Sequence, residues 1–267
     1  MTAERPTRAL GWRVYGLGVM LIALLCLARG DFDPGQPVPK AFPERAVLAY
    51  AAGAYMLVAA AAIEWRRTVA WGAGALTAYY TLVVVILMDG RSILRHAGEY
   101  LAYSNTAGQV AIAAGGLIVF ATHAEIDPPL AARLTRMGQV AFGVCALLFG
   151  GAHFFYMNLT APLVPSWLPP SQVFWGYATG VAHIAAGLAI LSRVQARLAA
   201  ILLTVMFASF TPLVHLPMLL ADPSNQGVWT ENAANLAYTG VAWVVADSLA
   251  GLGSRMKDRR TTPTSAS

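Results

Sequence analysis

The chain has 267 residues, of which 57% are apolar or aromatic and only 12% are charged, and its mean hydropathy is +0.57. A soluble domain carries about 25% charged residues, so this chain has too little polar material to cover a folded globule. The composition therefore excludes a soluble protein, a disordered chain and a nucleic-acid-binding protein. The net charge of +5 is better explained by basic loops that set the orientation of a membrane protein.

Apolar stretches between charged or proline-rich breaks predict eight transmembrane helices, because about 20 apolar residues cross the hydrocarbon core of a bilayer. Helices are expected because lipid cannot satisfy open backbone groups. The fold class is thus an all-α, polytopic membrane helical bundle. The first span is retained rather than interpreted as a signal peptide, because no cleavage site follows it. The predicted spans are 10–28, 45–63, 68–88, 106–122, 136–154, 172–191, 195–220 and 231–249.

Lys and Arg residues predict the orientation of the bundle. If the N-terminus is inside, 13 of the 18 basic residues lie on the inner side, and the outer side holds only Arg29, Lys40, Arg45, Arg91 and Arg95. Cytoplasmic loops of membrane proteins carry such an excess of positive charge. Both termini are therefore expected in the cytoplasm.

The chain contains one internal repeat. Residues 38–43 (VPKAFP) match 164–169 (VPSWLP), and residues 50–53 (YAAG) match 177–180 (YATG). Four spans in each half is an even number, so both halves insert with the same orientation. The sequence predicts a parallel tandem repeat of two four-helix units, related by an axis along the membrane normal.

This repeat defines the expected domains. The N-terminal membrane unit covers 1–123 and the C-terminal membrane unit covers 136–252. A cytoplasmic linker, 124–135, joins them, since Asp127 and the two prolines after it are expected to break the helix. The polar stretch 253–267 is expected to be a disordered cytoplasmic tail.

Short matching stretches run through the second half: 151–154 (GAHF), 160–169 (TAPLVPSWLP), 177–180 (YATG), 186–188 (AGL), 215–217 (HLP) and 235–237 (NLA). By these stretches the second half resembles the DoxX-like family of bacterial membrane proteins. The resemblance implies a four-helix unit in the bacterial inner membrane. One branch of that family is linked to thiosulfate oxidation coupled to quinone reduction. The cofactor is therefore left unassigned, with a quinone as the candidate that the resemblance offers, together with a membrane or periplasmic redox partner.

Polar residues at membrane depth are concentrated in the second half. Ionisable groups there cost several kcal/mol unless they are paired, so they mark candidate sites. His183 lies roughly 16 Å into its span, near the midplane. One interpretation is an outward-facing polar pocket, and the other is that each group caps a helix or bonds to a neighbouring helix. The pocket candidates are His153, Asn158, His183, His215, Glu231, Asn232 and Asn235.

Other chemistries are less favoured by the residue spacing. Three histidines and a carboxylate suit zinc, but no pair has local ligand spacing and their depths differ by about a dozen ångströms. Haem ligation by two facing histidines is disfavoured as well. Cys26 and Cys145 form no C-x-x-C motif and are expected to be apolar filler.

In the first half, charged residues follow the first and third spans and are expected to form surface ion pairs between loops. All of the second cluster except Asp89 lies in 91–103, a segment that is alternatively a short amphipathic helix along the membrane interface. The residues concerned are Arg29, Asp31, Asp33, Asp89, Arg91, Arg95, His96 and Glu99.

Two functional hypotheses remain open from the sequence. The first is a quinone-linked membrane redox component that uses the His/Glu/Asn pocket. The second is a non-enzymatic carrier of a small solute or lipid, or a membrane subunit for a partner protein. No catalytic residue is assigned, and membrane lipids are the partners common to both hypotheses.

Overall fold

The computed structural model describes residues 10–261, with side chains for 10–250, and every regular element in that range is helical. The long helices are α1 (Gly11–Arg29), α2 (Arg45–Glu64), α3 (Val69–Ala78), α5 (Tyr100–His123), α6 (Pro128–Phe155), α8 (Gln172–Ser192), α9 (Ala196–Phe210) and α11 (Gln226–Thr261). Two π-helical segments continue α3 and α9, namely η1 (Tyr79–Asp89) and η3 (Thr211–His215). The short elements are α4 (Gly90–Arg95), α7 (Met157–Thr160), η2 (Ala161–Leu163) and α10 (Leu216–Ala221).

Seven helical stretches of the described residues are long and apolar enough to cross a membrane. One of them, Val69–Arg95, joins α3, η1 and α4, and another, Ala196–Ala221, joins α9, η3 and α10. The eighth long helix, α11, is not among the seven and carries several polar residues, including Glu231 and Asp247. The described part of the chain is all-helical, as predicted, and its apolar helices are those of a multi-pass membrane protein.

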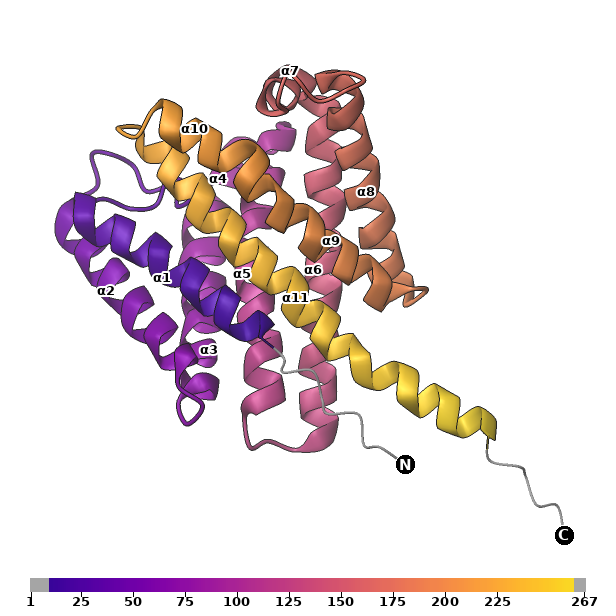
Figure 1. Cartoon of the computed structure of the whole chain (residues 1–267). Coiled ribbons are helices and arrows are strands. Elements are labelled where there is room, and N and C mark those ends of the chain that lie inside the picture. Colours follow the sequence, from indigo (N-terminus) through magenta and orange to yellow (C-terminus); the bar gives the residue numbers. More distant parts are fainter. Residues whose placement is uncertain (1–9, 262–267) are drawn as a thin grey trace, which may run out of the picture.

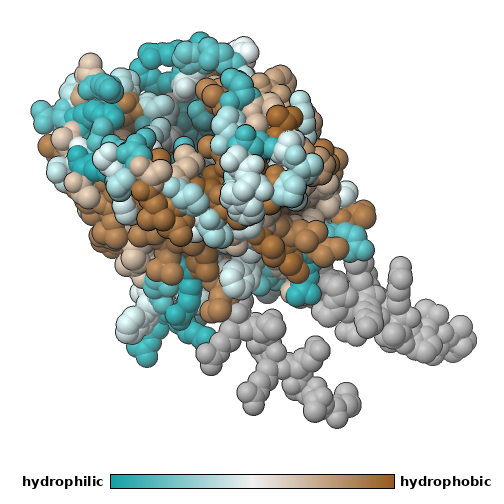
Figure 2. Space-filling view, turned by 45° about the horizontal axis from the view of Figure 1, so that its top comes forward, coloured by the Kyte–Doolittle hydropathy of each residue, from teal (hydrophilic) through white to brown (hydrophobic). Residues whose placement is uncertain are grey.

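The helices form one bundle whose two ends differ (Figure 1). The upper end carries the 30–44 segment, α4, α7 and α10, and the lower end carries the turns at 65–68, 124–127 and 193–195. On the face that Figure 2 shows, hydrophobic side chains cover the middle of the bundle, and hydrophilic side chains gather on its upper end. Such an apolar belt between polar ends is what a bilayer requires of the surface that it covers.

Several helices extend beyond the predicted apolar spans. Helix α5 begins at Tyr100 rather than at residue 106, and the third span continues to Arg95. The interpretation of 91–103 as an interfacial helix is therefore wrong, because its first part continues the third span and its last part opens α5. A hydropathy pattern predicts only the apolar part of a helix. The helical hydrogen bonds of the backbone can continue beyond that part, so the helix is longer than the predicted span.

The predicted linker 124–135 is mostly helix. Only residues 124–127 separate α5 from α6, which begins at Pro128 with Asp127 as its N-cap residue. A proline in the first helical turn lacks an N–H that would have no partner there anyway, so Pro128 and Pro129 start this helix rather than break it. Helix α11 runs to Thr261, so 253–261 of the predicted tail are helical in this structure, and 262–267 lie outside the described residues.

Helix α1 packs most closely on α11, and glycines make this contact possible. A Cβ atom on Gly240 would lie 2.1 Å from the backbone nitrogen of Tyr15, and one on Gly18 would lie 2.3 Å from that of Ala237. In lipid, helices associate through close van der Waals packing of small residues. Helix α1 also packs on α2, and α11 also packs on α5 and α9, so the contact between the first and last helices links these neighbours to one another.

The two ends of the bundle should face opposite sides of the membrane. We expect Ser166→Cys, exposed at the upper end, and Glu125→Cys, exposed at the lower end, to react with a membrane-impermeant maleimide from opposite sides. Native Cys26 and Cys145 are 2% and 1% exposed, so the unmodified chain serves as the background control. Labelling of both variants from the same side would contradict this topology.

The α1–α11 contact gives a stability prediction. Gly240→Ala should lower the melting temperature in detergent, because the added methyl group would overlap the α1 backbone and overpacking costs about 1–3 kcal/mol. Gly98→Ala is the matched control, since a Cβ there would have nothing within 4 Å. Equal melting temperatures for the two variants would show that close packing of α1 on α11 does not contribute to the stability of the fold.

Candidate functional site

A cavity of about 350 Å³ lies among α5, α6, α8, α9 with η3, and α11. Of the seven pocket candidates, five line it: His153, His183, His215, Glu231 and Asn235. The remaining lining residues are Ser104, Phe149, Ala152, Phe207, Phe210, Ala234 and Tyr238. The structure therefore brings together polar groups from four helices of the second half, with Ser104 contributed by the first half.

His183 is the most enclosed of these groups, at 2% exposure. Its Nδ1 lies 3.0 Å from the carbonyl oxygen of Thr179, one turn earlier in α8. A carbonyl oxygen only accepts, so Nδ1 carries the proton and Nε2 is left as an acceptor. Nε2 is buried and has no hydrogen-bond partner among the described residues. An unpaired buried acceptor costs about 1–3 kcal/mol, which a ligand with an O–H or N–H group would recover.

Aromatic rings surround the His183 imidazole. The centroids of the Phe207 and Phe149 rings lie 5.4 and 6.0 Å from that of His183, both in edge-on arrangements. The His153 ring stacks on His183 at 5.7 Å, with an interplanar angle of 25°. Flat, mostly apolar walls with a few polar atoms are typical of sites for small aromatic ligands.

His153 and His215 are also incompletely paired. The Nδ1 atom of each is buried without a partner among the described residues. His215 ends η3, on the side of the upper end of the bundle, and Glu231 is an exposed residue in the early part of α11. The titratable groups thus extend from the enclosed His183 to an accessible carboxylate.

Asn235 has a structural task in addition to lining the cavity. Its Nδ2 donates to the carbonyl oxygen of Phe207 at 2.9 Å and to Oγ1 of Thr211 at 3.0 Å. In a π-helix the N–H of residue i bonds to the carbonyl of residue i−5, and Pro212, which has no N–H, leaves the Phe207 carbonyl without that donor. The Asn235 amide takes the place of the missing donor and ties α11 to η3.

The other two candidates lie outside the cavity. Asn232 donates from Nδ2 to the carbonyl oxygens of His215 at 3.1 Å and Val228 at 3.2 Å, so it joins α11 to the start of α10. Asn158 is exposed on α7. Asn232 therefore fits the alternative interpretation, in which a polar group bonds to a neighbouring helix. Neither Asn232 nor Asn158 lines the predicted pocket.

Sequence reasoning missed several lining residues. Phe149, Phe207 and Tyr238 are ordinary apolar-span residues in the sequence, and no spacing distinguishes them from core residues. Ser104 precedes the predicted start of its span, and it belongs to the other half. Among the described residues, no three His, Cys, Asp or Glu side chains gather in a group suited to a metal ion. Cys26 and Cys145 are buried and free.

Two carboxylates of the first half are buried, contrary to the expectation of surface ion pairs. Asp33 is 8% and Asp89 is 3% exposed, and neither has an ion-pair partner among the described residues. The 30–44 segment folds back over the bundle and carries Asp33 and Gln36 inward. Two ion pairs do form here, Asp31 with Arg45 and Glu99 with His96 at 3.0 Å, but neither joins the two charged clusters to each other.

The burial of Asp33 predicts a pH dependence of stability. Burial raises its pKa from 3.8 to about 6, although Oδ1 accepts a hydrogen bond from the backbone N–H of Gly35. The folded state therefore holds this proton more tightly than the unfolded state, and the stability it contributes below pH 4 is lost as pH rises through about 6.

We expect Asp33→Asn to raise the free energy of unfolding at pH 8 by up to about 3 kcal/mol, and with it the melting temperature. At pH 4 neither quantity should change. The amide keeps the acceptor oxygen for Gly35 and cannot ionise. Glu125→Gln, at an exposed site on the lower end, should have no effect at either pH. A variant less stable than the parent at pH 8 would mean that the charged carboxylate has a stabilising partner.

Comparison with known proteins adds one match. Residues 142–245 match a family model described as a domain of unknown function, DUF8561. No curated protein matches the chain, and no solved structure does. The matched segment begins in α6 and ends in α11, so it contains His153, His183, His215 and Glu231 from the cavity.

Proposed function

We propose that the chain is an eight-span inner-membrane protein built as a parallel repeat of two four-helix units. The start of the second helix in each unit supports the repeat. Arg45 begins α2 and donates to the carbonyl oxygen of Val38, and Gln172 begins α8 and donates to that of Val164 at 2.5 Å. These two valines open the matching VPKAFP and VPSWLP stretches, so equivalent residues make equivalent bonds.

Glycine contacts and helix type also support the repeat. A Cβ on Gly53 would meet Leu27 and Cys26 of α1, and one on Gly180 would meet His153 and Phe154 of α6. The second helix of each unit thus approaches the first helix at the matching glycine. The third helix of each unit contains a π-helical segment, η1 in one and η3 in the other.

Packing between the two units also supports the repeat. Helix α1 packs on α11, and α6, the first helix of the second unit, packs on α5, the last helix of the first unit. Exchanging the two units converts one contact into the other, as an axis along the membrane normal requires. Basic residues are more frequent at the lower end, which we assign to the cytoplasm together with both termini.

We propose that the second unit is a DoxX-like, quinol-binding redox component. The observation that carries this proposal is the buried His183 Nε2, an acceptor without a donor in an aromatic-lined cavity. A quinol hydroxyl donates a hydrogen bond to such an atom, whereas a quinone carbonyl cannot. The site therefore favours the reduced form of the carrier.

The polar groups of the cavity suit proton transfer. Oxidation of a quinol releases two protons and two electrons. His183 Nε2 is placed to accept a hydroxyl proton, and His153, His215 and Glu231 lie between it and the upper end of the bundle. The electrons leave to a membrane or periplasmic partner protein that carries a redox centre. The alternative, a non-enzymatic carrier of a small solute or lipid, is favoured by a second cavity in the first unit, described below.

Quinol binding should depend on His183. We expect the parent protein in detergent to bind decylubiquinol more tightly than decylubiquinone by titration calorimetry under anaerobic conditions. His183→Leu should weaken quinol binding by about tenfold or more, since it removes the acceptor, and should keep a normal melting curve.

Met56→Leu is the matched control, because Met56 occupies the position equivalent to His183 in the repeat and is completely buried. It should leave quinol binding unchanged. Equal affinities for quinol and quinone, or an unchanged affinity in a folded His183→Leu protein, would contradict the proposed function.

A further inference from the structure

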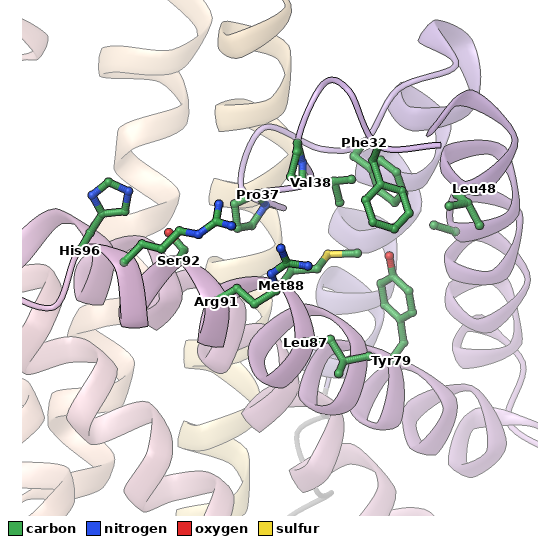
Figure 3. Close-up of a pocket in the computed structure, with 14 residues that line it drawn as sticks. Phe32, Pro37, Val38, Leu48, Tyr79, Leu87, Met88, Arg91, Ser92 and His96 are labelled. Carbon is green, nitrogen blue, oxygen red and sulfur yellow. The ribbon is translucent and has the colours of Figure 1, made fainter. Parts of the chain in front are cut away.

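The largest cavity of the described pockets lies in the other unit and has no part in the quinol proposal. Its volume is about 600 Å³, within the size range of sites for single small ligands. It lies at the upper end of the bundle, between the 30–44 segment, α2, η1 and α4 (Figure 3). No local sequence pattern predicts it, because its walls come from three separate stretches of the chain.

Most of the wall of this cavity is apolar. Leu48 and Ala52 come from α2, and Leu87 and Met88 come from η1. The 30–44 segment closes the cavity with further apolar side chains, and only the Tyr79 hydroxyl interrupts this part of the wall. Those residues are Phe32, Pro37, Val38, Pro39 and Phe42.

One edge of the cavity is cationic. Arg91 and Arg95 lie four residues apart on α4, so they share a face of that helix, and Ser92 and His96 lie beside them. Figure 3 shows the Arg91 side chain extending from its helix toward Pro37 and Val38. The edge therefore combines two guanidinium groups with a hydroxyl.

No carboxylate lines the cavity to balance these charges. Among the described residues, Arg91 and Arg95 have no ion-pair partner, since Asp31 pairs with Arg45 and Glu99 with His96. Asp89 is next to α4 in sequence, but it is buried and does not line the cavity. Guanidinium groups bind carboxylate and phosphate oxygens strongly, because their N–H groups match the oxygen geometry.

We propose that this cavity binds a single-chain anionic amphiphile, such as a long-chain fatty acid. The carboxylate lies at Arg91 and Arg95, and the hydrocarbon chain lies between α2 and η1. Position supports this arrangement, since α4, which carries the cationic edge, lies toward the upper end of the bundle (Figure 1), and a charged headgroup needs such a polar end. Volume also supports a single chain, because a two-chain phospholipid needs about twice the space of one chain.

The test uses the full chain in phosphatidylcholine nanodiscs with a dansyl-labelled undecanoic acid as the fluorescent probe. Palmitate should displace the probe. Hexadecanol has the same chain without the charge and should displace the probe at least about tenfold less well. A tenfold difference corresponds to the loss of roughly one charge-assisted hydrogen bond. Inorganic phosphate, which has the charge without the chain, should not displace it.

Two variants localise the binding. Arg91→Gln with Arg95→Gln should weaken probe binding about tenfold, and Arg66→Gln with Arg67→Gln, at the lower end, should not change it. Leu48→Trp should also weaken binding by filling the cavity, and it should leave the melting temperature unchanged, because Leu48 is 41% exposed.

Each contrary outcome overturns the proposal. Equal displacement by hexadecanol would mean an apolar slot without anion recognition, and stronger displacement by phosphatidylglycerol would mean a membrane-lipid site. Unchanged binding in the folded arginine variant would place the probe elsewhere. Since this cavity belongs to the first unit, none of these outcomes affects the quinol proposal, which is tested at His183.

Discussion

The close approach of α1 and α11 is the contact on which the rest of the structure depends. Where lipid surrounds the helices, burial of apolar surface gives little preference for one helix partner over another, so shape decides. Gly18 and Gly240 remove the side chains that would hold the two backbones apart. With α11 held against α1, its remaining faces meet α5 and α9, and the polar residues near its start face the histidines of the second unit.

The π-helical segments connect packing to the chemistry of the sites. A π-helix widens the backbone and leaves a carbonyl without its usual donor, which is why such segments are frequent at functional sites. In η3 the freed Phe207 carbonyl is bonded by Asn235, and the same segment ends at His215. The segment η1 ends at Asp89 and brings Leu87 and Met88 to the wall of the cavity that Arg91 and Arg95 border. Each proposed site therefore lies beside the helix whose backbone departs from α geometry.

Hydropathy and residue depth predicted a large part of this arrangement. The bounds of the spans at 10–28, 45–63, 172–191 and 195–220 agree with the helices to within a residue or two, because both ends of those helices coincide with a change of polarity. The start of α6 was not predictable from hydropathy, since Pro128 reads as a break until its place in the first turn is known. The polar residues of the second unit were predicted as candidates because burial without partners is costly, but depth alone could not separate His215 from Asn232. The inward fold of Asp33 depends on the path of the 30–44 segment, which leaves no periodic pattern in the sequence.

The contacts between the two proposed units have the form of an isologous homodimer interface. Two copies of a single four-helix unit related by a two-fold axis would make the same pair of contacts, first helix against last helix, twice. The short turn at 124–127 then converts two chains into one. Fusion of this kind releases the two copies from identical sequences, so one could keep histidines where the other has Met56 and Cys26. A symmetric ancestor with two equal sites would in this way become an asymmetric protein in which each half binds a different molecule.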